Sequence, residues 1–269
     1  MSVLKKSLLI MAGLGIPAFF AGLATFAEGA PPHAGPITGR IVLAGPRPEP
    51  RELDPGRDRC CQEALPSDES LLVSDEGGLA NVVIWASGPP IATVTGPPNL
   101  LEPSVHELTN KGCAFQPRVT LLRAGERLVL TNADPTTHNL NATFRKNPSF
   151  NVVLAPQARR ELSLDAAEPK PAPVACNIHP FMRAWVLVRD DPYAAVSDAS
   201  GHFELPAGLP AGQIRLTFWH EGRYLAGVPT PAGVTDRRGR IGLTLPLAEA
   251  STPYELGELR IDPRWFAAQ

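Results

Sequence analysis

The sequence predicts an all-β fold in which short strands pack into β-sandwiches. Its 269 residues include 30 prolines and 23 glycines, and helix interiors tolerate neither residue well. Beyond residue 35, apolar runs extend for only a few residues before a Pro or Gly interrupts them. Short strand-like runs also recur at the spacing typical of sandwiches. The length is sufficient for one large or two modest domains.

The first 27 residues have the pattern of an export segment. Lys5 and Lys6 precede an apolar run that reaches Ala27, and small residues near its end offer a cleavage site. We expect a signal peptide at residues 1–27. The alternative is an uncleaved N-terminal anchor, because the run is about long enough to span a bilayer. Either reading predicts a periplasmic or otherwise extracytoplasmic protein.

The charge balance argues against nucleic acid as a partner. Residues 1–27 contain two of the 25 basic residues and none of the 27 acidic ones, so the remaining chain is more acidic than the net −2 of the whole. Nucleic-acid-binding domains usually carry a basic surface.

Strand signals lie on both sides of a Pro- and Gly-rich stretch at residues 87–100. We expect strands at 39–43, 71–73, 80–85, 118–122, 127–131, 151–154, 161–164, 174–176, 184–188, 203–205 and 214–219.

A candidate metal site lies in the segment from Cys176 to Met182. It places a thiolate, the imidazole of His179 and the thioether of Met182 within seven residues, and His138 lies upstream. Two His and one Cys with a weak axial Met form the ligand set of blue (type 1) copper sites. Met182 is also the only methionine outside the export segment. The alternatives are plain core packing and zinc, for which Met is a poor ligand.

Two stretches carry a family resemblance. The sequence CNIHPFMRAWVLV resembles the ligand loop of amicyanin-type cupredoxins, and FQPRVTLLRAGERLVLTNADPTTHNL resembles the strands that lead to the first His ligand in plastocyanin-like domains. The resemblance covers about residues 100–190. It implies a Greek-key β-sandwich with one type 1 copper ion at one end, bound by His138, Cys176, His179 and Met182. It also implies supporting roles for Asn139, Pro180 and Phe181. Pro169, Pro171 and Pro173 are a departure, and they put the pairing of the strand before Cys176 in question.

The other three cysteines are disulfide candidates, because export favours oxidation. We expect Cys113 to pair with Cys60 or Cys61, and the sequence does not choose between them.

The flanks resemble a second module. Residues 198–203 and 209–212 resemble the carboxypeptidase-regulatory-like (transthyretin-like) β-sandwich, and residues 39–43 resemble its first strand. We therefore expect a cupredoxin domain at 100–190 inserted into a smaller sandwich formed by 36–97 and 191–263. The alternative is a separate C-terminal domain at 191–263.

These features favour an exported electron carrier that exchanges single electrons with redox proteins and has no catalytic site. Multicopper oxidases and copper nitrite reductases need additional copper sites, often built from H-x-H pairs, and none of the six histidines forms such a pair. The alternative is a non-catalytic copper-storage or structural binding protein of the cell envelope.

Overall fold

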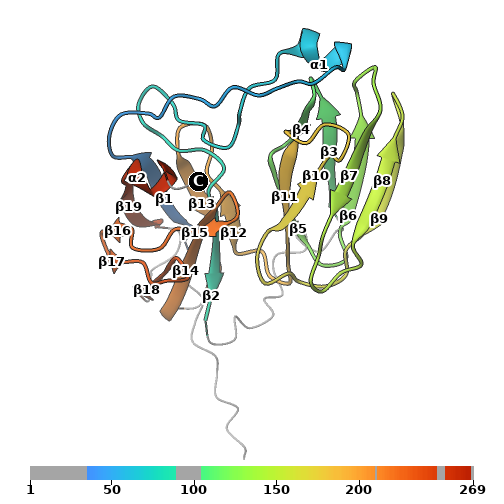
Figure 1. Cartoon of the computed structure of the whole chain (residues 1–269). Helices are drawn as coiled ribbons and strands as arrows, with labels where there is room; N and C mark the ends of the chain where they lie inside the picture. The colour runs from blue at the N-terminus through green and yellow to red at the C-terminus, as the bar shows by residue number, and fades with distance from the viewer. Residues whose placement is uncertain (1–34, 89–103, 210, 247–251, 268–269) are drawn as a thin grey trace, which may run out of the picture.

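The computed structural model describes residues 35–88, 104–209, 211–246 and 252–267. The predicted all-β class is confirmed: the described residues form strands and two short helices (Figure 1). The predicted signal peptide at 1–27 and most of the 87–100 stretch lie outside the described residues. Among the described residues, no helix is long and apolar enough to cross a membrane.

The first sandwich lies between residues 105 and 189. Its strands are β3 (Val105–Lys111), β4 (Ala114–Gln116), β5 (Val119–Arg123), β6 (Arg127–Asn132), β7 (His138–Ala142), β8 (Phe150–Leu154), β9 (Arg159–Ser163), β10 (Ala172–Ala175) and β11 (Arg183–Arg189). One sheet has the order β4-β3-β6-β9 and the other β5-β11-β10-β7-β8. β3 runs parallel to β6, and β5 runs parallel to β11.

Alternating apolar residues of these two sheets form one buried core. Leu128, Leu130, Leu140 and Val186 are fully buried in it, and Cys176 and Met182 belong to the same cluster. In β6, Leu128 and Leu130 lie two residues apart and therefore share the inward face of the strand. The candidate ligands Cys176 and Met182 therefore pack against the interior of the sandwich.

The prolines before Cys176 do not prevent the formation of β10, but this strand pairs with its neighbours over only a few residues. β10 pairs with β11 over four residues, but its register with β7 includes only Val174 and Ala175. Pro173 lies within β10 and is exposed. A proline has no N–H to donate to a neighbouring strand, which limits the ladder at this point.

The flanking strands come from both ends of the chain. They are β1 (Ile37–Leu43), β2 (Val83–Ser87), β12 (Ala194–Val196), β13 (His202–Leu205), β14 (Gly212–His220), β15 (Arg223–Tyr224), β16 (Pro229–Thr230), β17 (Gly233–Val234), β18 (Arg240–Leu245) and β19 (Tyr254–Ile261), followed by helix α2 (Arg264–Ala267). β1 pairs with β13 and β19, and β2 pairs with β12 and β14. Strands before residue 88 therefore pair with strands after residue 193, as an inserted domain requires. The domain boundaries and the transthyretin-like resemblance stay predictions.

A buried polar contact joins the two groups of strands. Arg118, just before β5, donates to both carboxylate oxygens of Glu221 at 2.6 and 2.9 Å. The indole N–H of Trp185 donates to Glu221 at 3.2 Å. Trp219 is fully buried in an adjoining apolar cluster with Val119.

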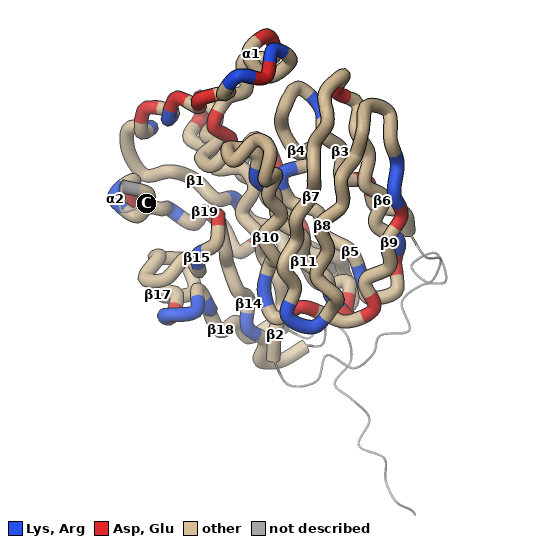
Figure 2. The backbone as a smooth tube through the Cα atoms, turned by 45° about the vertical axis from the view of Figure 1, so that its right-hand side comes forward, with Lys and Arg blue, Asp and Glu red and all other residues tan. Residues whose placement is uncertain are grey.

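The segment between β1 and β2 extends away from its own strands. It crosses to the end of the first sandwich, where helix α1 (Arg59–Ala64) lies beside β4 and β3 (Figure 1). The segment and α1 contain both acidic and basic residues (Figure 2). Cys61 of α1 forms a disulfide with Cys113, in the turn between β3 and β4.

Cys60 and Cys61 both lie in the short helix α1. Asp58 is the N-cap of α1 and accepts a hydrogen bond from the Cys60 N–H at 2.9 Å. This hydrogen bond stabilises the start of the six-residue helix. Successive residues of a helix point about 100° apart. Cys61 is fully buried and faces Cys113, whereas Cys60 is only partly buried and keeps a free thiol.

Fully buried His220 at the end of β14 makes stability depend on pH. Burial lowers the pKa of His220 from its usual 6.5 to about 4, and the opposing effect of the Glu221 carboxylate is smaller. The unfolded chain then binds a proton between these values that the folded chain does not, so stability falls as pH falls through this range. We therefore expect acidification through this range to lower the free energy of unfolding of the wild type by about 3 kcal/mol more than that of the His220→Gln variant.

Urea unfolding at pH 7 and pH 4.5, compared between wild type and His220→Gln, measures this difference. Equal loss of stability on acidification in both proteins would contradict the assignment to His220.

Candidate metal centre

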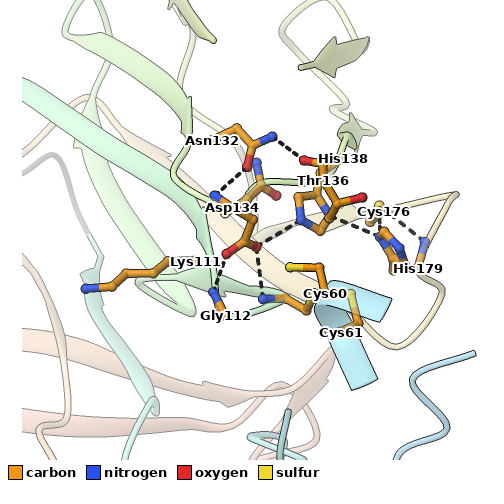
Figure 3. A network of polar contacts seen from close by, with 12 residues as sticks. Cys60, Cys61, Lys111, Gly112, Asn132, Asp134, Thr136, His138, Cys176 and His179 are labelled. Atoms are coloured by element: carbon orange, nitrogen blue, oxygen red, sulfur yellow. Dashed lines mark hydrogen bonds and ion pairs between the residues drawn. A yellow bond between two sulfur atoms is a disulfide. The ribbon is translucent and has the colours of Figure 1, made fainter. Parts of the chain in front are cut away.

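The candidate ligands meet at one end of the first sandwich. His138 is the first residue of β7, and Cys176 and His179 lie in the loop between β10 and β11 (Figure 3). One donor atom from each of these three residues lies within 4.8 Å of the other two. All three side chains are buried: His138 is fully buried, and Cys176 and His179 are 1% and 4% exposed.

The donor atoms have the spacing of ligands around a single ion. The Nδ1 atoms of His138 and His179 are 3.0 Å apart, and the Cys176 sulfur is 3.8 Å from His179 Nδ1. Nitrogens at about 2.0 Å and a sulfur at about 2.3 Å from one tetrahedral or trigonal ion are separated by roughly 3–4 Å. Soft thiolate together with imidazole suits copper in both oxidation states. The residues present therefore fit a copper ion.

Each candidate ligand histidine contacts a carboxylate through its other ring nitrogen. His138 Nε2 lies 2.9 Å from Asp134, and His179 Nε2 lies 3.2 Å from Asp58. With the hydrogen on Nε2 in each ring, the lone pairs of the two Nδ1 atoms point toward each other and repel. A cation bound between them removes this repulsion. Contacts of the type carboxylate–histidine–metal also fix the orientation of the ligand rings.

The two carboxylates are themselves held by hydrogen bonds. Asp134 accepts from the backbone N–H groups of Gly112 and Cys113 at 2.6 and 3.0 Å. Asp58 accepts from the Thr136 hydroxyl at 2.7 Å, and this bond is the main reason that the pKa of Asp58 is lowered. For His138, burial is the largest influence and lowers the ring pKa despite the attraction of Asp134. A neutral His138 keeps its Nδ1 lone pair available.

Met182 closes the ligand loop. It is 2% exposed and lies in the same core cluster as Cys176. Its N–H donates to the His179 carbonyl at 2.9 Å, and its carbonyl accepts from the Cys176 N–H at 3.2 Å. This tight turn keeps the Met182 backbone next to both residues, while its role as axial ligand stays a prediction.

Asn139 braces the loop from the neighbouring strand. Its side-chain oxygen accepts from the backbone N–H groups of Asn177 and Ile178 at 2.8 and 3.3 Å and lies 3.4 Å from the Cys176 sulfur. Asn151 fixes the Asn139 amide by accepting from it at 2.7 Å. These bonds tie the loop to β7, while the supporting role of Asn139 in a copper centre stays a prediction.

Pro180 and Phe181 occupy the turn after His179. Pro180 is exposed and restricts the backbone there. The half-buried Phe181 ring lies 6.0 Å from the His179 ring and packs against the core of the sandwich.

Loss of the Asn139 brace should loosen the loop. In Asn139→Ala, the N–H groups of Asn177 and Ile178 lose their acceptor, and a ligand supported by such contacts typically loses metal affinity by 10- to 100-fold. We expect copper to dissociate to a chelator about tenfold faster or more. Asn141→Ala is a matched control, because within the described part of the chain the Asn141 side chain hydrogen-bonds only the side chain of Asn177. Equal rates in the two variants would contradict the brace.

Two further groups of potential ligands overlap this centre. One comprises Asp58, Cys61 and His179, and the other comprises Cys113, Asp134 and His138. Their cysteines are joined in the disulfide and supply no thiolate. Cys60 has a free thiol, but burial, followed by the charges of Asp134 and Asp58, raises its pKa. Cys176 is therefore the thiolate donor that the centre offers.

Asp58, Thr136 and Asp134 are not among the site residues predicted from the sequence. Asp134 does lie in the stretch before His138 that carries the family resemblance. Asp58 is separated from His179 by 121 residues, and only the disulfide candidates Cys60 and Cys61 nearby pointed to its segment.

Several solved structures are similar to part of this chain. A copper-containing nitrite reductase from Thermus scotoductus is 20% identical, with a TM-score of 0.30, over 34% of this chain and 23% of its own. A purple cupredoxin from Nitrosopumilus maritimus is 18% identical, with a TM-score of 0.27, over 31% of this chain and 98% of its own. A copper(I) amicyanin variant is 14% identical, with a TM-score of 0.28, over 39% of this chain and 98% of its own.

This chain thus spans about a quarter of the nitrite reductase but nearly the whole of the two small proteins. No family model and no curated protein matches the sequence.

Proposed function

We propose that this protein binds one type 1 copper ion at His138, Cys176, His179 and Met182 and carries single electrons between redox proteins. The observation that carries the proposal is the convergence of two imidazole Nδ1 atoms and one thiol within 4.8 Å of one another. These three residues are buried in a packed sandwich, which resists rearrangement. A rigid site that accommodates both oxidation states supports electron transfer with little movement.

The proposed setting is the periplasm or another extracytoplasmic compartment. The predicted export segment at residues 1–27 supports it, as does the Cys61–Cys113 disulfide, because disulfides persist in oxidising compartments. The proposed partners are redox proteins that donate or accept one electron. Substrate turnover forms no part of the proposal.

Voltammetry of the copper-loaded protein distinguishes a carrier from a copper store. We expect a reversible one-electron wave and retention of copper through repeated reduction in the presence of a Cu(I) chelator. Irreversible reduction, or transfer of copper to the chelator at each cycle, would instead favour the storage alternative.

A further inference from the structure

The segment Asp58–Cys61, hereafter the cap, covers the His179 side of the candidate metal centre. It comes from the connection between β1 and β2, outside the strands that hold the ligands (Figure 1). We propose that the cap is a working part of the copper centre: Asp58 is a positioning residue that orients and polarises His179, and the disulfide holds it in place. This inference rests on the proposed copper function.

Asp58 is placed for this role by three hydrogen bonds. One carboxylate oxygen accepts the Cys60 N–H at 2.9 Å and so caps α1. The other accepts the Thr136 hydroxyl at 2.7 Å and lies 3.2 Å from His179 Nε2. Thr136 stands two residues before His138, so Asp58 also links the segment that leads to His138 with the loop that carries His179. Its orientation is therefore set by the helix and by the sandwich together.

The disulfide connects the two carboxylate–histidine pairs. Cys61 lies three residues after Asp58, and its partner Cys113 donates its backbone N–H to Asp134 at 3.0 Å. Asp134 in turn contacts His138 Nε2 at 2.9 Å. One covalent bridge thus anchors the supports of both histidines. Residues from outside the first sandwich therefore contribute to the surroundings of the candidate ligands.

The cap has two chemical consequences. A carboxylate that accepts the Nε2 hydrogen increases the electron density that the imidazole donates to a metal, and this favours Cu(II) over Cu(I). His179 is only 4% exposed and its Nε2 contacts Asp58, so we expect the cap to restrict the access of chelators to this side of the centre. The cap thereby lowers the reduction potential and slows the exchange of copper.

The charge of Asp58 can be removed without removing the cap. Asn is as good an N-cap as Asp, so Asp58→Asn keeps α1 capped while it removes the negative charge beside His179. We expect about a tenfold shift of the Cu(II)/Cu(I) equilibrium toward Cu(I), which corresponds to an increase of about 59 mV in the one-electron potential.

Asp54→Asn is the matched control. Asp54 lies in the same segment and is exposed, and among the described residues its side chain hydrogen-bonds only the Gly56 N–H, at 2.8 Å, so its replacement removes an equal charge that does not contact the histidines. Equal potentials for Asp58→Asn, Asp54→Asn and wild type would overturn the assignment of Asp58.

The shielding role is tested without copper. Cys60 and Cys176 are the free cysteines, so Cys60→Ser leaves the Cys176 thiol as the single reactive group. Adding Cys61→Ala and Cys113→Ala removes the disulfide and introduces no new thiol. We expect a charged aromatic disulfide reagent to modify Cys176 in the apo protein at least about tenfold faster in the triple variant than in Cys60→Ser. An equal rate in the two folded proteins would overturn the shielding role.

The two measurements separate failure of the cap from failure of the proposed function. If the wild type forms no type 1 centre, the proposed function fails, while the thiol reaction still decides whether the cap shields Cys176. If the triple variant does not fold, the potential of Asp58→Asn, which retains the disulfide, decides the role of the cap.

Discussion

Replacement of Cys176 with alanine is expected to abolish the intense visible absorption of the copper-loaded protein. In type 1 sites that absorption arises from charge transfer between the cysteine thiolate and copper, and the centre offers no second thiolate, because Cys61 and Cys113 are bonded to each other. The two imidazoles that remain can still hold Cu(II), but only in a weakly coloured form. We expect the fold to persist, because the change removes a single buried sulfur atom.

Cys60→Ser is the matched control for this prediction. Cys60 is the other free cysteine and lies in α1, so its replacement tests whether any thiol near the centre contributes. The blue absorption should remain unchanged in Cys60→Ser. Persistence of the band in Cys176→Ala, or its loss in Cys60→Ser, would contradict the ligand assignment.

The second large effect is expected at the buried contact between Arg118 and Glu221. Both side chains are less than 10% exposed, and the two-point hydrogen bonds satisfy the Arg118 guanidinium in a poorly solvated place. Glu221→Gln leaves that guanidinium without a charged partner. Breaking a buried ion pair by removing one partner costs about 3–5 kcal/mol. We expect a loss of this size in the free energy of unfolding.

Urea unfolding followed by tryptophan fluorescence measures this loss, because Trp185 and Trp219 lie at the same contact. Glu161→Gln is the control. Glu161 pairs with Arg127 at 3.0 Å on the surface, where such a pair contributes less than about 1 kcal/mol. Similar losses in the two variants would show that the Arg118–Glu221 contact does not hold the strands together.

The fold class and the ligand loop could be predicted because their signals are local. The spacing of Cys176, His179 and Met182 lies within one loop, and short apolar runs mark strands such as β6, where Leu128 and Leu130 share one face. His138 lies farther away, but the stretch before it resembles the strands that lead to the first His ligand in plastocyanin-like domains. Strands β3, β4, β7, β12 and β15 to β19 were not predicted, and most of them are brief or polar runs that carry little periodic signal. The strand predicted at 71–73 is present only as an isolated bridge at Val73.

The cap could not be predicted, because its contacts depend on the tertiary fold. Nothing near Asp58 in the sequence indicates that it reaches His179. Cys61 rather than Cys60 pairs with Cys113 because of the helical geometry of α1. One N-cap residue and a few polar neighbours were too weak a signal to predict that helix. The pairing of β1 with β19 likewise depends on contacts between opposite ends of the chain.

Copper titration of the purified chain, followed by visible absorption and electron paramagnetic resonance, tests the proposed type 1 site. We expect one equivalent of Cu(II) to produce an intense blue charge-transfer band and a narrow copper hyperfine splitting. Colourless or weakly bound copper would contradict this expectation and would leave a β-sandwich protein whose buried His138, Cys176 and His179 serve another purpose.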